Sequence, residues 1–203
     1  MLPPLPKPSE AALVAASAYA GPWRWTSFGH TKVLDTEWNG YRVASFQGTI
    51  LNGYDILRDI RFVPWWDRYG GFGPAGFVKG VQQVIEEMIA DLIADARAQR
   101  LIFVGHSLGG AEALRAASHF AGLGAPPAAV FAFEPPRAGL LKLKRSLKKV
   151  PVFICHNGNS PVPYVPWLYR HPAKVTKIGR WCWEPIHCHR IAQIHADLVA
   201  AGL

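Results

Sequence analysis

Residues Leu101 to Ala117 read LIFVGHSLGGAEALRAA. Four apolar residues come first, the pattern G-x-S-x-G follows with Ser107 at its centre, and a run of strong helix formers closes the stretch. This order predicts a strand, a sharp turn and a helix, in which Gly105 and Gly109 leave the space that the turn requires. We therefore expect the Ser107 hydroxyl to stand at the carboxyl end of a central strand as a nucleophile. The backbone N–H of Leu108 is expected to open the helix and to face developing negative charge.

Short apolar strands alternate with helices along the rest of the chain. The pattern predicts strands over 41–46, 101–104, 129–133, 152–155 and 174–178, and helices over 11–20, 81–100, 111–123 and 190–201. This alternation is typical of an α/β fold, a layered sandwich around a mostly parallel sheet. With 203 residues the chain is long enough for a single domain over 1–203, which begins with a proline-rich arm over 1–8.

Basic residues give the chain a net charge of +8, and five of them gather within 142–149 with apolar residues interleaved. This segment is either a solvated helix face or a surface that attracts anionic lipid or an acidic partner. No nucleic-acid-binding motif accompanies the charge, so we expect no nucleic-acid partner. No apolar run reaches the roughly 18 residues of a membrane span, so we expect no transmembrane segment. No signal peptide is recognisable either, which favours a cytoplasmic protein or one released without such a signal.

The cysteines are Cys155, Cys182 and Cys188, an odd number without the spacing of a disulfide framework. A bridge between the last two is possible, but the pattern favours reduced, buried thiols. Cys182, His187, Cys188 and His189 crowd together, yet their spacing matches no structural zinc pattern. We therefore expect no metal.

A serine nucleophile needs a base, and with this kind of turn the chain order is serine, acid, histidine. His187 and His189 lie late in the chain, just before the closing helix. With these residues in place the chain resembles the class 3 lipases, a branch of the α/β-hydrolases, and especially their small bacterial and phage-encoded members. Residues 105–110 are that family's G-H-S-L-G-G, 46–49 are similar to its F-R-G-[ST], and 133–139 are similar to its F-G-x-P-R-x-G. The resemblance covers most of the chain and implies an α/β-hydrolase-like three-layer sandwich.

The resemblance also implies roles for single residues. Ser107 is expected to be the nucleophile and His189 its base, with His187 as the alternative. Thr49 matches the family residue that supplies an oxyanion-hole donor, next to the N–H of Leu108. This chemistry needs no metal or organic cofactor.

An aromatic and glycine-rich stretch over 52–76 stands where class 3 lipases carry their lid. Trp65 and Trp66 within it are expected to bind substrate as an apolar cover, or else they fill the core under a long loop. Asp59 resembles an aspartate of the family.

The chain departs from the family at the acid. The family's acid sits in a D-x-V-P segment, and residues 157–163 read NGNSPVP with Ser160 where aspartate belongs. Ser160 is then a weakened third member, because a hydroxyl orients the histidine without the charge that stabilises imidazolium. The alternatives are Asn157 or Asn159 as the orienting group, or a carboxylate from elsewhere, for which Glu134 at the end of the next strand is the candidate.

These residues predict a serine ester hydrolase, a lipase or esterase that acts on apolar acyl esters through an acyl-enzyme. Two alternatives stay open. The missing aspartate is compatible with a catalytically weakened protein of the same fold that binds lipid or a partner. The serine turn alone is also compatible with a peptidase or amidase.

Overall fold

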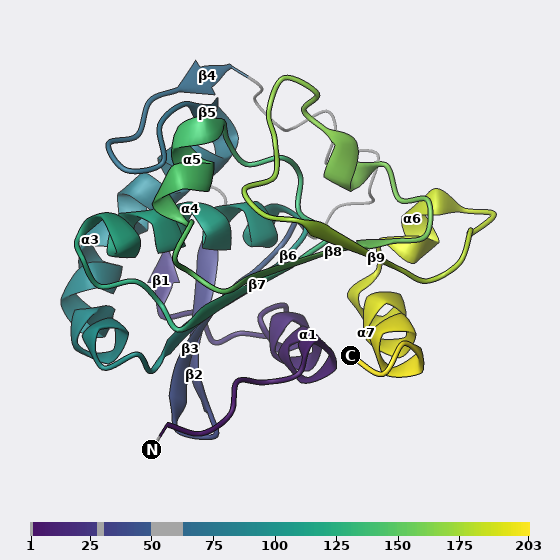
Figure 1. Cartoon of the computed structure of the whole chain (residues 1–203), viewed down its shortest axis with the longest axis horizontal. Coiled ribbons are helices and arrows are strands. Elements are labelled where there is room, and N and C mark those ends of the chain that lie inside the picture. Colours follow the sequence, from purple (N-terminus) through teal and green to yellow (C-terminus); the bar gives the residue numbers. More distant parts are fainter. Residues whose placement is uncertain (1, 28–30, 50–62) are drawn as a thin grey trace.

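The computed structural model describes residues 2–27, 31–49 and 63–203. A seven-stranded sheet in the order β1-β2-β3-β6-β7-β8-β9 forms its centre (Figure 1). The strands are β1 (Trp25–Thr26), β2 (Lys32–Trp38), β3 (Tyr41–Phe46), β6 (Leu101–His106), β7 (Ala129–Phe133), β8 (Val152–Asn157) and β9 (Val175–Ile178). The five strands from β3 to β9 are parallel, and β1 and β2 are antiparallel additions at one edge. The predicted α/β fold with a mostly parallel sheet is confirmed.

Helices cover both faces of this sheet. Helices α3, α4 and α5 lie on one side, and α1 and α7 lie on the other (Figure 1). The helices are α1 (Pro8–Ser17), α3 (Ala75–Arg97), α4 (Leu108–Gly122), α5 (Leu141–Ser146), α6 (Pro185–Cys188) and α7 (Ile191–Ala200), with a 3-10 turn at Val162–Tyr164 and a small second sheet of β4 (Pro64–Trp65) and β5 (Gly73–Pro74).

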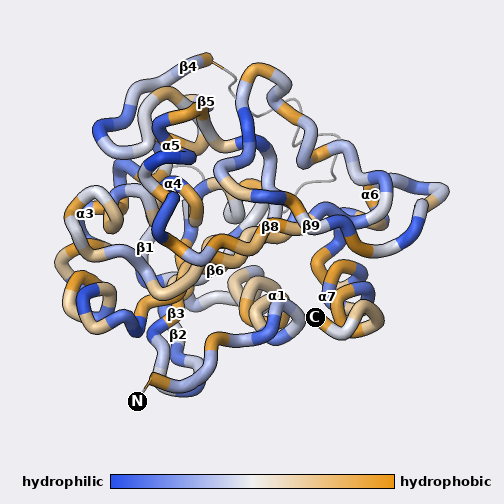
Figure 2. Tube along the Cα trace, in the orientation of Figure 1, coloured by the Kyte–Doolittle hydropathy of each residue, from blue (hydrophilic) through white to orange (hydrophobic). Residues whose placement is uncertain are grey.

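Two apolar cores result from the alternation of side chains along the strands. On β6, Leu101 and Phe103 pack under α3 and α4, whereas Ile102 and Val104 pack against α1 and α7. All four side chains are buried, which explains why this strand is a continuous apolar run rather than an alternating one. The apolar band along the central strands is visible in Figure 2.

Some element boundaries differ from the sequence-based expectation. Helix α3 begins at Ala75, six residues before the predicted start, because Phe77 and Val78 extend its buried face back to Pro74. Strand β2 was not predicted, since charged residues interrupt its apolar ones and it gains its pairing from β3. Within the described ranges, no helix combines the length and the apolar character that a bilayer crossing needs.

Candidate active site

Ser107 occupies the turn between β6 and α4. Its backbone has φ 55° and ψ −126°, a conformation that costs energy for a residue with a side chain. Gly105 and Gly109 make the turn possible, because a Cβ on Gly105 would collide with the backbone of Gly109, and one on Gly109 with the backbone of Phe46. Ser107 is therefore held where the parallel strand ends and the helix begins, as the sequence predicted.

His189 reaches Ser107 from the loop between α6 and α7. Its Nε2 lies 2.9 Å from Ser107 Oγ, so the hydroxyl can donate to the ring. Burial lowers the pKa of His189 to about 4, which keeps the imidazole neutral and able to accept a proton. His187, the alternative base, is exposed and lines a surface groove with Trp181 and Trp183 instead.

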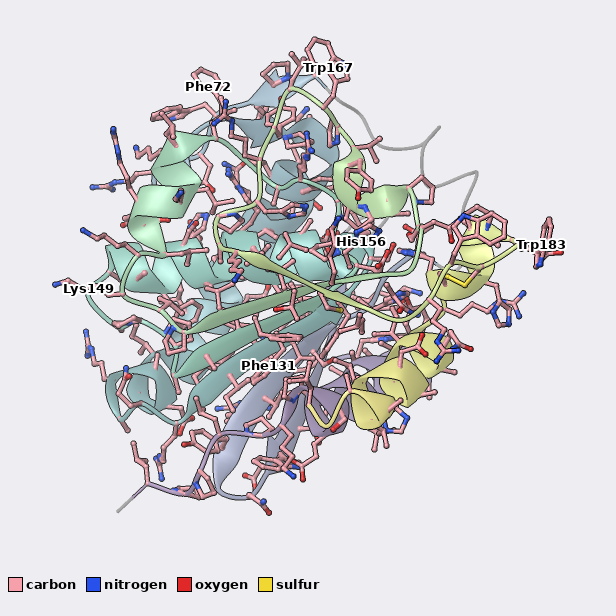
Figure 3. All side chains as sticks on the ribbon, turned by 45° about the vertical axis from the view of Figure 1, so that its right-hand side comes forward. Phe72, Phe131, Lys149, His156, Trp167 and Trp183 are labelled. Atoms are coloured by element: carbon pink, nitrogen blue, oxygen red, sulfur yellow. A yellow bond between two sulfur atoms is a disulfide. The ribbon has the colours of Figure 1, made fainter. Side chains whose placement is uncertain are left out.

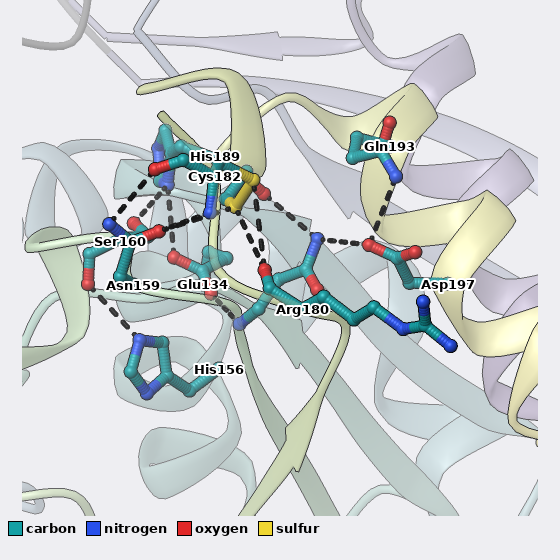
Figure 4. Close-up of a disulfide and its surroundings, with 11 residues drawn as sticks. Glu134, His156, Asn159, Ser160, Arg180, Cys182, His189, Gln193 and Asp197 are labelled. Atoms are coloured by element: carbon teal, nitrogen blue, oxygen red, sulfur yellow. Dashed lines mark hydrogen bonds and ion pairs between the residues drawn. A yellow bond between two sulfur atoms is a disulfide. The ribbon is translucent and has the colours of Figure 1, made fainter. Parts of the chain in front are cut away.

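Two groups face the other ring nitrogen of His189. Glu134 Oε2 lies 3.2 Å from Nδ1, and Ser160 Oγ lies 3.4 Å from the same atom (Figure 4). The Glu134 side chain follows β7, is fully buried, and accepts a hydrogen bond from the backbone N–H of Asn157. Burial raises the pKa of Glu134 to about 7. The structure thus brings both acid candidates to one histidine.

The two asparagines are held elsewhere. Asn157 Nδ2 donates to Cys188 O and to Asp197 Oδ2, at 3.0 and 2.8 Å. The side chain of Asn159 pairs with the backbone of Cys182, accepting from its N–H at 2.8 Å and donating to its carbonyl oxygen at 3.1 Å. Both amides therefore hold the loop that carries His189 rather than the imidazole ring.

The same loop contains a disulfide between Cys182 and Cys188 (Figure 4). The expectation of reduced thiols is wrong for this pair, because the chain after β9 folds back and brings the two Cα atoms within 6.1 Å. Cys155 is a buried free thiol. Oxidation removes two of the four groups considered as zinc ligands, and Cys188 ties the residue next to His189 to the preceding turn.

The residues predicted to bind the oxyanion follow β3 and β6. Strand β3 runs parallel to β6 with Phe46 opposite Gly105, so Thr49 follows at the same sheet edge as Ser107. Gly48 packs directly on the turn, since a Cβ at that position would lie 3.2 Å from Ser107 Cβ. Leu108 is the first residue of α4.

Trp65 and Trp66 lie on the surface rather than in the core. They are 42% and 51% exposed, and Trp66 packs edge-to-face against Phe72 with ring centroids 5.2 Å apart. Lys142 of α5 places its Nζ 4.4 Å from the Trp66 ring. Asp59 and the rest of the stretch over 50–62 lie outside the described residues.

A buried ion pair, which the sequence did not indicate, fixes the chain beside these tryptophans. Arg115 of α4 donates to Asp67 Oδ2 at 2.9 Å, and the two side chains are 0% and 1% exposed. The same guanidinium donates to the carbonyl oxygens of Gly70 and Gly71, and His119 Nε2 lies 3.1 Å from Asp67. Helix α4, which begins directly after Ser107, is thereby held against residues 67–71.

Comparisons with known proteins agree with the fold described above. The family model described as "Lipase (class 3)" matches residues 43–169. Among solved structures, the Rhizomucor miehei lipase propeptide complex superposes with a TM-score of 0.70 at 18% identity, over 84% of this chain and 67% of that one. A mutant form of MDLA from Penicillium cyclopium gives 0.67 at 21% identity over 94% of both chains, and lipase II from Rhizopus niveus gives 0.64 at 22% identity over 79% and 74%.

No curated protein sequence matches the chain. The fold is nevertheless shared with these fungal lipases, and the family match spans more than half of the chain, including Ser107, Glu134 and Ser160. The protein belongs to the class 3 lipase family.

Proposed function

We propose that this protein is a serine ester hydrolase that cleaves apolar acyl esters through an acyl-enzyme. The observation that carries the proposal is the continuous line from Ser107 Oγ to His189 and on to Glu134, with separations of 2.9 and 3.2 Å. His189 takes the proton of Ser107 as the hydroxyl attacks the ester carbonyl, and returns it to the leaving alcohol. Water, activated by the same histidine, then releases the acid.

We assign the third position to Glu134 and a supporting position to Ser160. A carboxylate stabilises the imidazolium that forms when His189 accepts the proton, whereas a hydroxyl offers only a neutral hydrogen bond. Ser160 also hydrogen-bonds Glu134, which favours the ionised carboxyl. On this assignment the acid follows β7, whereas the family pattern would place it at position 160, after β8. The serine at position 160 is then a partner of the carboxylate rather than its weak replacement.

The backbone N–H groups of Thr49 and Leu108 are proposed to bind the oxyanion. Support comes from the parallel pairing of β3 and β6, which brings the residues after both strands to one edge. Removal of one such donor typically costs about 2.7–4 kcal/mol of barrier.

The proposed substrate is a lipid ester met at a lipid surface. Helix α5 carries Lys142, Lys144 and Arg145, the basic residues at 148 and 149 follow it directly, and Leu141 at its start is 57% exposed. Lys142 lies over Trp66, so cationic and aromatic side chains form one amphipathic patch that suits an anionic lipid surface. Phe72, Trp167 and Trp183 project outward from the molecule (Figure 3), and Trp167 and Trp183 are 78% and 91% exposed.

The test is hydrolysis of short- and long-chain p-nitrophenyl esters and of emulsified triacylglycerol, each with Ser107→Ala as the control. We expect turnover that Ser107→Ala abolishes, with long-chain esters and the emulsion favoured for a lipase and short-chain esters for a carboxylesterase. Parallel p-nitroanilides test the amidase alternative. Binding of anionic vesicles without any turnover that depends on Ser107 would instead support the lipid-binding alternative and reject hydrolysis.

A further inference from the structure

A chain of three hydrogen bonds connects the oxyanion side of the site to the histidine loop, behind the reacting atoms. His106, the residue before the nucleophile, places its Nε2 2.7 Å from the backbone carbonyl oxygen of His189. Its Nδ1 lies 2.7 Å from the hydroxyl of Tyr19. The same hydroxyl hydrogen-bonds the backbone of Gly48, next to Thr49.

The direction of each hydrogen bond follows from the chemistry of the atoms. A carbonyl oxygen only accepts, so His106 Nε2 carries a hydrogen and donates it to His189 O. Burial lowers the pKa of His106 to about 3, so the ring is neutral and its Nδ1 is a bare acceptor. Tyr19 therefore donates to Nδ1, and its oxygen is left to accept from the N–H of Gly48.

Gly48 is required for this arrangement. A Cβ at position 48 would overlap the Tyr19 hydroxyl and would lie 2.6 Å from the carbonyl oxygen of His106. Tyr19 itself comes from the turn after α1, a helix that packs on α7. The amino-terminal segment is thus connected to both the end of β3 and the loop before α7.

We propose that Tyr19 and His106 are positioning residues, which hold the oxyanion donors and the His189 base in register around Ser107. The inference rests on the proposed hydrolase function. The physical reason is that β3 and the loop after α6 are separate segments of the chain. The oxyanion donors after β3 and the imidazole of His189 must both stay within a fraction of an ångström of their productive positions, so that proton transfer and the hydrogen bond to the oxyanion occur together. The buried His106 ring, with one permitted tautomer, and the half-buried Tyr19 side chain fix that distance without touching substrate.

The experiment compares Tyr19→Phe with Tyr41→Phe. Each variant removes one tyrosine hydroxyl and one hydrogen bond, but Tyr41 bonds Pro3 O at the opposite end of β3. We expect Tyr19→Phe to lower kcat about tenfold with KM unchanged. Tyr41→Phe should keep kcat at the wild-type value, even if its Tm falls by as much as the Tm of Tyr19→Phe does. A Tyr19→Phe enzyme with kcat within twofold of wild type overturns the inference.

Variants of His106 separate positioning from packing. His106→Leu fills the space without hydrogen bonds, and we expect a loss in kcat of about 100-fold. His106→Gln keeps an N–H that can donate to His189 O, so we expect it to recover part of that loss at the same KM. Equal kcat values for the leucine and glutamine variants, at equal Tm, show that packing alone matters and reject the proposal.

A readout that needs no turnover keeps this inference distinct from the proposed function. Nitrogen NMR of the imidazoles should report His106 as the neutral Nε2–H tautomer in wild type, with Nδ1 shifting on Tyr19→Phe and not on Tyr41→Phe. If wild type shows that tautomer and the shift but no ester hydrolysis that depends on Ser107, the proposed function fails while the hydrogen-bond chain stands. A His106 that is protonated or of the other tautomer overturns the inference even if the enzyme is active.

Discussion

Replacement of Glu134 by glutamine is the sharpest probe of the proposed triad, because the surrounding hydrogen bonds fix how the new amide must sit. The N–H of Asn157 donates to Glu134 Oε1, so the amide oxygen of the glutamine takes that position. Its NH₂ group then faces His189 Nδ1, where Glu134 Oε2 lies at 3.2 Å. A donor at Nδ1 selects the Nε2–H tautomer, and that tautomer cannot accept the proton of Ser107.

The expected loss follows from the charge as well as from the tautomer. At 3.2 Å, a carboxylate and an imidazolium attract by about 5 kcal/mol at an effective dielectric constant of about 20. Since about 1.4 kcal/mol is tenfold in rate, Glu134→Gln should lower kcat by roughly 10³ to 10⁴. Ser160→Ala removes one neutral hydrogen bond and should cost about tenfold or less. Ser160→Asp should give no gain, since it adds a second buried carboxylate beside Glu134.

The assay is kcat on one soluble p-nitrophenyl ester for wild type and all three variants, with Tm recorded to confirm that each one is folded. Ser107→Ala sets the background. The assignment of Glu134 is refuted if Glu134→Gln stays within tenfold of wild type while Ser160→Ala loses three orders of magnitude. A gain in kcat/KM from Ser160→Asp would likewise return the third position to residue 160.

The other predictions concern pH, a buried ion pair and the disulfide. Burial raises the pKa of Glu134 to about 7, so the fraction of the required carboxylate form increases with pH, and kcat/KM should rise from pH 6 to pH 8. This rise should vanish in Glu134→Gln, and a rise that persists in that variant would belong to another group. Asp67→Asn leaves the charge of Arg115 buried without its partner, so it should lower the free energy of unfolding by about 3–5 kcal/mol. Urea denaturation measures this loss, and a loss below about 1 kcal/mol would contradict the expectation. Reduction of the bridge between Cys182 and Cys188 should lower the free energy of unfolding by about 2 kcal/mol. The measurement is urea denaturation with and without reductant, and equal unfolding midpoints in the two conditions would show that the bridge does not stabilise the fold.

Local patterns determined the central elements. The apolar run and the glycines around Ser107 predict strand, turn and helix from residues that are neighbours in the chain, and β6 and α4 form there. Edge elements had weaker signals: β2 mixes charged with apolar residues and depends on its pairing with β3. The start of α3 was predicted six residues too late, because Phe77 and Val78 extend its buried face back to Pro74.

The third member of the site shows what sequence could not decide. Family resemblance pointed to residue 160 and chain position pointed to Glu134, and both predictions were reasonable because strands β7 and β8 end at one sheet edge. Only the folded chain shows that both side chains reach Nδ1 of His189, which lies 55 residues after Glu134 and 29 after Ser160.

By itself, the sequence determined the α/β class, the strand–turn–helix around Ser107 and the late segment that contains His189, because these depend on periodicity, on glycine and on chain order. The tertiary structure decided which groups meet: the pairing of Cys182 with Cys188, and the contact of Tyr19 with His106, which lies 87 residues away in the chain. Such contacts leave no local pattern, since a tyrosine after a helix looks the same wherever its hydroxyl points. They arise only when the packing of α1, α7 and the parallel strands has fixed the distances between distant segments.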